Sequence, residues 1–153
     1  MAKEEVFSHP VQGPLVRGFR AFPVRREGLD RQALRQARGV LREGLALGMF
    51  PEGTRSTAAQ LQKGLPGVAH LALHGSSTIL PVGIAGTENI KGLGFLLRRP
   101  RLTVNIGEPF KLPPVDGKLT KAKLAQATDV IMECIAELLP ESYRGVYGDR
   151  RDM

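Results

Sequence analysis

The chain has 153 residues of ordinary globular composition: 42% are hydrophobic, 24% are charged, 5% are aromatic, and the formal net charge is +7. This balance favours one domain over residues 1–153 and excludes a wholly disordered chain, while the lone Cys134 excludes an internal disulfide and fits a reducing, cytosolic compartment. No apolar run approaches the roughly 18 residues of a membrane-spanning helix, and the first residues lack the pattern of a signal peptide.

The first part of the chain predicts two helices separated by an extended segment. Residues 11–18 favour a short helix, and residues 19–24 favour an extended stretch that Pro23 interrupts. Asp30 suits an N-cap, and the apolar residues after it recur at three- and four-residue steps, which predicts an amphipathic helix. These apolar positions are Leu34, Ala37, Leu41 and Leu45. Residues 46–50 are an apolar run that ends at Pro51, which favours a buried strand.

The second part predicts two more helices and two more strands. Pro66 suits the first turn of a helix over residues 66–74, and Gly75 is a natural stop. Residues 79–85 favour a strand, residues 86–100 an irregular Gly-rich loop, and residues 101–106 a strand with one buried face. Thr120 caps a last amphipathic helix, whose apolar positions are Leu124, Ala127, Ile131, Ile135 and Leu138. Strands that alternate with helices predict an α/β domain with a mostly parallel sheet flanked by helices.

Positive charge is concentrated between residues 17 and 42. This stretch holds eight arginines and two carboxylates, a net charge of +6, and Arg98, Arg99 and Arg101 form a second basic cluster. Such clusters attract the phosphates of nucleic acids, anionic lipid headgroups or small metabolites. A solvated helix face is the simpler alternative, and charge alone does not choose among these interpretations.

The segment around Glu52 carries the strongest chemical signal. A run predicted to be a strand ends there in a turn with a carboxylate, a hydroxyl, a guanidinium and a glycine that permits a sharp bend. Ligands of α/β sheets usually bind at such strand ends. Arg55 could bind a phosphate through two hydrogen bonds, and Glu52 could accept hydrogen bonds from hydroxyls or orient an arginine. An ordinary polar turn remains the alternative.

The seven residues of this segment, Phe50-Pro51-Glu52-Gly53-Thr54-Arg55-Ser56, resemble the most distinctive block of the glycerophospholipid (1-acylglycerol-3-phosphate, or lysophosphatidate) acyltransferase family. Three other stretches are also similar to that family. They are residues 22–26, Ile79-Leu80-Pro81-Val82, and residues 101–110 with Ile106-Gly107-Glu108-Pro109. The end of the chain, Leu139-Pro140-Glu141-Ser142-Tyr143-Arg144-Gly145, resembles the family as well.

The resemblance implies an O-acyltransferase of phospholipid synthesis. It would move a fatty acyl group from an acyl thioester, acyl-CoA or acyl carrier protein, to the free hydroxyl of lysophosphatidate or a related lysophospholipid, without a cofactor. The implied substrate-binding residues are Arg25, Arg26, Glu52, Gly53, Thr54 and Arg55, and Pro81 would shape the acyl side of the site. Arg26 and Arg55 would neutralise the glycerol phosphate. The resemblance also implies a cytoplasmic protein, peripheral at the inner face of an anionic membrane.

The family's catalytic His-x-x-x-x-Asp motif is not found in these residues. The positions five residues after His9, His70 and His74 are Pro14, Gly75 and Ile79. In the family the motif precedes the segment that begins this chain, so we expect an N-terminally truncated domain whose catalytic base lies upstream of Met1. A recorded truncation, a decaying gene and a natural short form that binds lipid without catalysis are the three explanations.

Several other interpretations stay open. His70 and His74 would share a helix face, but no acidic or cysteine partner is near in sequence, so we predict no metal site. Cys134 lies among apolar positions, which favours packing over nucleophilic chemistry. Glu52 could act as a general acid or base without a histidine. The alternative function is a non-catalytic module that binds anionic lipid or nucleic acid through residues 17–42; without interleaved aromatic residues, we expect no nucleic acid.

Overall fold

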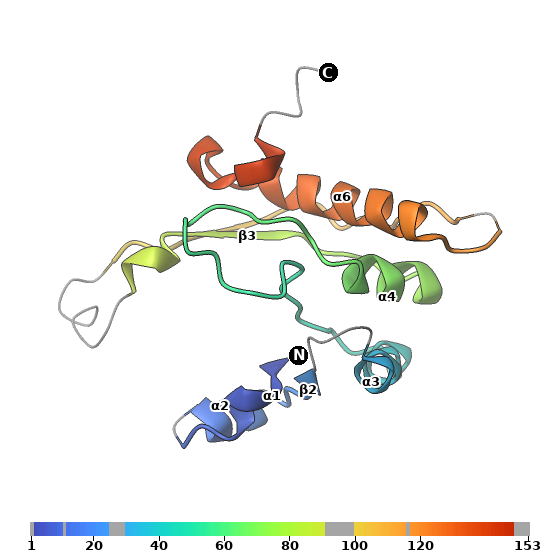
Figure 1. The fold of residues 1–153 in the computed structure, drawn as a ribbon, viewed down its shortest axis with the longest axis horizontal. Coiled ribbons are helices and arrows are strands. Elements are labelled where there is room, and N and C mark those ends of the chain that lie inside the picture. The colour runs from blue at the N-terminus through green and yellow to red at the C-terminus, as the bar shows by residue number, and fades with distance from the viewer. Residues whose placement is uncertain (1, 11, 25–29, 91–99, 116, 149–153) are drawn as a thin grey trace. The chain divides into compact units, whose positions relative to one another are not determined.

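The computed structural model describes residues 2–10, 12–24, 30–90, 100–115 and 117–148. Its backbone forms two compact units, Met1–Phe50 and Pro51–Met153, and each is described by itself (Figure 1). None of the helices in these described ranges is both long and apolar enough to cross a membrane. One domain over residues 1–153 stays a prediction.

The first unit contains short elements and one longer helix. The elements are β1 (Ala2–Lys3), α1 (Glu4–Phe7), α2 (Gln12–Gly18), β2 (Pro23–Val24) and α3 (Arg31–Arg42). The short helix predicted over residues 11–18 is confirmed as α2. Gly13 lies so close to α1 that an added Cβ would be 2.6 Å from the carbonyl oxygen of Phe7, and β1 pairs with β2 in parallel. These contacts hold the first elements together.

Helix α3 confirms the amphipathic helix predicted after Asp30 as far as Arg42, but the prediction for Leu45 is wrong, since it lies beyond the helix and is 52% exposed. The Asp30 carboxylate accepts a hydrogen bond from the Ala33 amide at 2.9 Å, which satisfies one of the free N–H groups of the first turn. Ala33, Leu34 and Ala37 are buried on one side of the helix. Arginines at four- and three-residue spacing occupy the other side, because apolar and basic residues alternate at the helical period.

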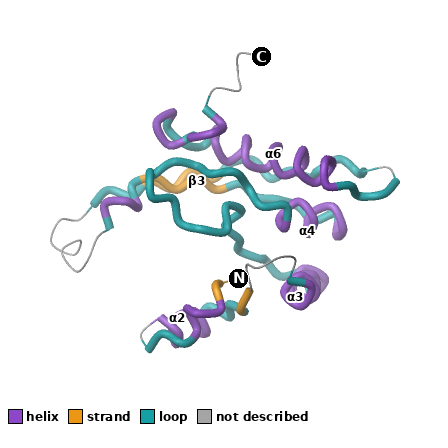
Figure 2. The backbone as a smooth tube through the Cα atoms, viewed as in Figure 1, coloured by secondary structure: helices purple, strands orange, loops and turns teal. Residues whose placement is uncertain are grey.

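The second unit packs helices against a small antiparallel sheet. Its elements are α4 (Gly67–Gly75), β3 (Val82–Ala85), η1 (Thr87–Asn89), β4 (Thr103–Ile106), α6 (Lys121–Glu137), η2 (Glu141–Tyr143) and η3 (Gly145–Tyr147). Figures 1 and 2 show α4 beside α6, and buried Ala69, Ala127 and Ile131 join these two helices in one core. The predicted cap of α6 is confirmed, since the Thr120 hydroxyl accepts from the Lys123 amide at 3.3 Å. Helix α4 ends one residue later than predicted, with Ser76 in the left-handed conformation (φ 45°) instead of Gly75.

The predicted mostly parallel sheet is not confirmed in the described residues. The longest pairing there is antiparallel, between β3 and β4, with Ile84 opposite Val104. Only the two-residue pair of β1 and β2 is parallel. An α/β composition is therefore present, but β3 and β4 run antiparallel, a pairing that does not require a crossover helix.

The strand at residues 101–106 is confirmed as β4, but the prediction of a buried face for its apolar side chains is wrong. Val104 is 56% exposed and Ile106 is 66% exposed. The sheet instead packs on the α6 side through its glycines: a Cβ at Gly83 would be 2.9 Å from the side chain of Leu138, and a Cβ at Gly107 would be 3.2 Å from the same side chain. Helix α6 approaches the face that lacks bulky side chains, which leaves the branched side chains on the other face.

The buried strand predicted at residues 46–50 is wrong as well. No strand forms within these residues, all of which the structure describes, and Phe50 is 77% exposed. A short apolar run becomes a buried strand only where neighbouring strands pair with it, and the sequence of the run does not reveal whether such partners exist.

Candidate functional site

The segment predicted as a ligand-binding turn begins a closed surface loop. We call residues 51–65 the 51–65 loop. The amide of Leu65 donates a hydrogen bond to the carbonyl of Pro51 at 2.8 Å, so the two ends of the loop are tied together. Compact loops with adjoining ends are often functional because a fixed base presents exposed side chains.

Glu52 is the internal anchor of this loop. Its carboxylate Oε2 accepts a hydrogen bond from the Gln62 amide at 2.8 Å, across ten residues of sequence. The half-buried position raises the pKa of Glu52, because burial disfavours the charged carboxylate; the hydrogen bond from Gln62 opposes this in part. The observed partner of Glu52 is thus a backbone amide, which fixes the turn geometry.

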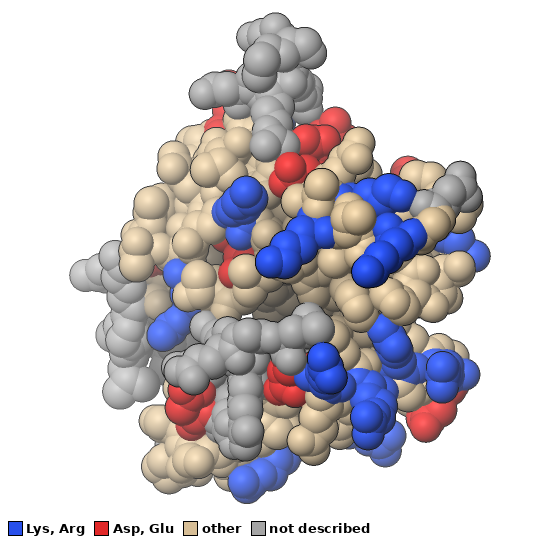
Figure 3. Space-filling model, turned by 45° about the vertical axis from the view of Figure 1, so that its right-hand side comes forward, with Lys and Arg blue, Asp and Glu red and all other residues tan. Residues whose placement is uncertain are grey.

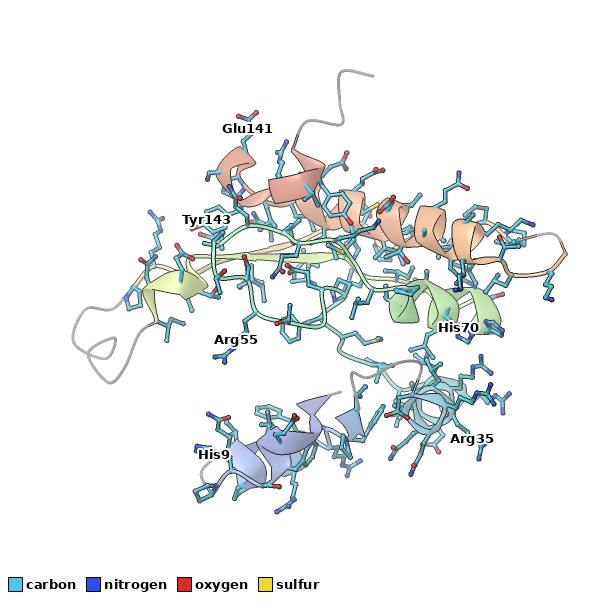
Figure 4. The ribbon with its side chains drawn as sticks, viewed as in Figure 1. His9, Arg35, Arg55, His70, Glu141 and Tyr143 are labelled. Carbon is cyan, nitrogen blue, oxygen red and sulfur yellow. The ribbon has the colours of Figure 1, made fainter. Side chains whose placement is uncertain are left out.

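Gly53 and its neighbours lie at the tip of the turn. Gly53 has φ +68°, a left-handed conformation that favours glycine, and a side chain there would run into that of Leu65. Thr54 and Arg55 are exposed, and Figure 4 shows the Arg55 side chain projecting from the loop. The arrangement presents a hydroxyl and a guanidinium to solvent beside an anchored carboxylate, which suits recognition of a phosphate and its neighbouring hydroxyls.

A hollow of about 730 Å³ with mixed polar and apolar lining borders the far part of the loop. Its lining includes Ser56, Gln60 and Lys63 from the loop, together with Glu141 and Val146 from the end of the chain. The Ser56 hydroxyl also accepts a hydrogen bond from the Gln60 amide at 3.1 Å. The loop therefore offers polar groups on more than its tip.

The other predicted site residues are not gathered around this turn by the described structure. Arg25 and Arg26 lie outside the described residues, and so do Arg98 and Arg99 of the second basic cluster. Pro81 is buried directly before β3, and its carbonyl accepts a hydrogen bond from the Gly107 amide at 3.0 Å. This backbone hydrogen bond joins Pro81 to the sheet. The role predicted for Pro81 in shaping the acyl side of the site stays a prediction.

The histidine pair and the cysteine show ordinary packing contacts. The rings of His70 and His74 stack with centroids 4.1 Å apart, and His74 Nδ1 lies 2.9 Å from the His70 carbonyl oxygen. No group of three or more His, Cys, Asp or Glu suited to a metal ion occurs in the part of the chain that the structure describes. Burial, followed by the nearby Glu137 and Glu133, raises the pKa of the Cys134 thiol, which disfavours a nucleophilic thiolate.

Helix α3 carries four of the six described arginines of the basic stretch, and Arg17 and Arg20 lie in and just after α2. Arg31, Arg35 and Arg42 are exposed and share one helix face at four- and seven-residue spacing. Lys and Arg side chains form visible groups on the surface in Figure 3, and Arg35 is labelled in Figure 4. This face can attract anionic groups through several charges at once.

Two contributors to the site had no clear signal in the sequence. Gln62 acts through its backbone amide, which every residue except proline possesses. The type of its side chain therefore does not indicate this role. Tyr147 is buried and its hydroxyl accepts from the Gly64 amide of the loop at 3.1 Å. The rarity of tyrosine in the chain, two in all, is the signal that could have drawn attention to it.

Comparison with known proteins gives a consistent set of relatives. The family model described as Acyltransferase matches residues 1–85, a range that includes the whole 51–65 loop and Pro81. The chain is 29% identical over 139 residues to the 1-acyl-sn-glycerol-3-phosphate acyltransferase of Bacillus subtilis (strain 168), covering 90% of the chain and 67% of that protein. It is 33% identical over 116 residues to the protein of the same name from Streptococcus pneumoniae, covering 75% of the chain and 41% of that protein.

A plant relative extends this set. The 1-acyl-sn-glycerol-3-phosphate acyltransferase of Cocos nucifera is 27% identical over 161 residues, covering 99% of the chain and 49% of that protein. The chain thus spans two thirds of the Bacillus protein and about half or less of the other two. No solved structure matches the chain significantly.

Proposed function

Because this chain belongs to the Acyltransferase family, we propose that it provides the acceptor-binding region for fatty acyl transfer to lysophosphatidate or a related lysophospholipid. In this reaction the free hydroxyl oxygen of the acceptor attacks the carbonyl carbon of an acyl thioester. The new C–O ester bond forms, the C–S bond breaks, and the thiol leaves with the proton of the hydroxyl.

One observation carries the proposal: the block at residues 50–56 lies within the matched family range and begins a closed loop with an anchored carboxylate. Glu52 is held by the Gln62 amide, and Arg55, three residues later, is exposed to solvent. A guanidinium binds a phosphate through two charge-assisted hydrogen bonds, so Arg55 would bind the phosphate of the acceptor, and Thr54 could bind a glycerol oxygen. The phosphate-binding role of Arg26, which lies outside the described residues, stays a prediction.

The chemical step needs a general base, and we assign none among these 153 residues. No histidine here is followed five positions later by aspartate. The assignment to this chain is therefore binding and orientation of the acceptor. We do not assign the group that removes the proton from the acceptor hydroxyl, because the described motifs of this sequence include no His-x-x-x-x-Asp pair.

We propose acyl-CoA or acyl carrier protein as the donor and an anionic membrane surface as the place of reaction. A thioester is already activated for acyl transfer, so no further cofactor is required. The exposed arginines of α3 would attract anionic headgroups at the cytoplasmic face, where lipid acceptors reside.

The proposal is tested by the affinity of the full chain for lysophosphatidate, below its micelle concentration, against a monoacylglycerol with the same acyl chain. We expect selective binding of lysophosphatidate and protection of residues 52–55 from hydrogen exchange. Arg55→Ala should weaken this binding roughly tenfold or more, because it removes a charged hydrogen-bond donor from the phosphate.

Arg101→Ala is the matched control, since Arg101 is also exposed in the second unit and its loss changes the net charge equally. Equal effects of the two substitutions, or equal affinity for the two lipids, would contradict the phosphate site. Salt-sensitive binding of an oligonucleotide with no effect of lysophosphatidate would instead support the nucleic-acid alternative.

A further inference from the structure

The returning arm of the 51–65 loop, residues 60–65, is held from two directions. The amides of Gln62 and Leu65 donate to the turn, as described above. The amides of Leu61 and Gly64 donate instead to the end of the chain, residues 141–148, which we call the C-terminal segment. A single stretch of backbone thus joins the candidate acceptor turn to the C-terminal segment.

Tyr147 is buried and hydrogen-bonded where the C-terminal segment contacts the 51–65 loop. Its side chain is 5% exposed and packs with Met132 of α6 and Leu61 of the loop. Its hydroxyl accepts from the Gly64 amide at 3.1 Å and donates to Asp129 Oδ1 of α6 at 3.4 Å. The loop is therefore connected through one phenol to helix α6.

Two close backbone approaches keep the arm in this position. A Cβ at Gly64 would lie 2.7 Å from Met132 Cγ, so the loop rests directly on α6. Gly145 has φ +52°, and a Cβ there would collide with the carbonyl oxygen of Leu61. The Leu61 amide completes the contact by donating to the Tyr143 carbonyl at 2.8 Å.

We propose that Tyr147 is a positioning residue for the candidate acceptor site: by holding the Gly64 amide, it sets the place of the Gln62 amide and through it the Glu52 carboxylate. Glu52 in turn fixes the turn that presents Thr54 and Arg55. The inference rests on the proposed function for the identity of the ligand. The mechanical connection from Tyr147 to Gln62 does not depend on that ligand.

The test is Tyr147→Phe in the full chain, which removes the hydroxyl and keeps the packed ring. Amide hydrogen exchange at Gln62 should become roughly three- to tenfold faster, the range expected for loss of one hydrogen bond. Exchange at Ile131, in the core of α6, should change less, since a purely global loss of stability accelerates both amides alike. Lysophosphatidate affinity should fall at least threefold.

Tyr143→Phe is the matched control. It removes a tyrosine hydroxyl too, but that hydroxyl donates to Glu88 at 2.6 Å, outside the 51–65 loop, and the Tyr143 carbonyl remains for Leu61. Gln62 exchange and lipid affinity should stay close to those of the unchanged chain.

Equal acceleration at Gln62 and Ile131, or none at Gln62, would overturn the positioning role. So would an unchanged lysophosphatidate affinity in Tyr147→Phe when the unchanged chain binds the lipid. If the unchanged chain fails to bind lysophosphatidate at all, the proposed function fails. The exchange at Gln62 then still decides whether Tyr147 holds the turn.

Discussion

At the scale of single residues, Glu52 combines a structural and a chemical role. Its carboxylate binds the Gln62 amide and is half-buried, while Arg55, three residues later, is exposed. Burial raises the pKa of Glu52, so ionisation of this carboxyl opposes folding. The half-buried Glu52 carboxyl costs the fold free energy when it ionises. We therefore infer that its role is to fix the geometry of the turn and not to increase the stability of the fold.

The first residue-scale prediction concerns Glu52→Gln. The folded pKa of Glu52 lies above its ordinary value of 4.5, so its contribution to the free energy of unfolding is largest below that value and declines as pH rises through the folded pKa. Glutamine keeps an oxygen for the Gln62 amide and never ionises. We therefore expect the melting temperature of Glu52→Gln, minus that of the unchanged chain, to increase from about pH 4 to about pH 7.

Glu108→Gln serves as the control for this pH series, because Glu108 is exposed and outside the loop. A difference for Glu52→Gln that shrinks with rising pH would show that hydrogen bonding, not burial, dominates the carboxyl's pKa.

The second residue-scale prediction compares two glycines with positive φ. Gly145→Ala places a Cβ against the carbonyl oxygen of Leu61, whereas Gly117→Ala, at φ +74°, meets no atom within 4 Å. Both should lose about 1 kcal/mol from the left-handed conformation, and Gly145→Ala should lose about 1–3 kcal/mol more from overpacking. Urea unfolding of both variants measures the difference; equal losses would mean that the C-terminal segment moves freely away from Leu61.

At the scale of elements, the four predicted helices are found, the short α1 was not predicted, and the predicted strand arrangement was wrong. The caps of α3 and α6 depend on residues three positions apart, Asp30 with Ala33 and Thr120 with Lys123. These contacts are local, so the sequence shows them directly. The pairing of β3 with β4 joins residues about twenty positions apart, and the period of a strand does not reveal its partner or its direction.

At the scale of the whole molecule, the surplus of positive charge determines which surfaces the chain approaches. Twenty-two basic residues against fifteen acidic ones give a sequence pI near 10.1. A net charge of this size favours anionic partners through long-range attraction, which salt screens within about 8–10 Å at ordinary ionic strength. The positions of the charges then decide whether one face of the protein accounts for most of the binding to an anionic partner.

We predict that the exposed face of α3 dominates binding to phosphatidylglycerol vesicles. Loss of three charges in Arg31→Gln, Arg35→Gln and Arg42→Gln together should reduce vesicle affinity roughly a hundredfold, at about 1 kcal/mol for each charge near the surface. The control removes three exposed charges elsewhere, in Lys111→Gln, Lys118→Gln and Lys121→Gln. Equal losses in vesicle co-sedimentation would assign binding to net charge alone, and no binding by the unchanged chain would refute the membrane proposal.

The sequence by itself determined the four longer helices, the N-caps of α3 and α6 and the block at residues 50–56 that indicated the family, because these depend on residue types at short separations. Only the tertiary structure decided that Glu52 binds the Gln62 amide and that Tyr147 holds the same arm of the loop. It also decided that residues 46–50 form no strand and that β3 and β4 run antiparallel. The physical reason is that backbone amides are alike in every residue except proline, so their partners are chosen by packing between distant segments.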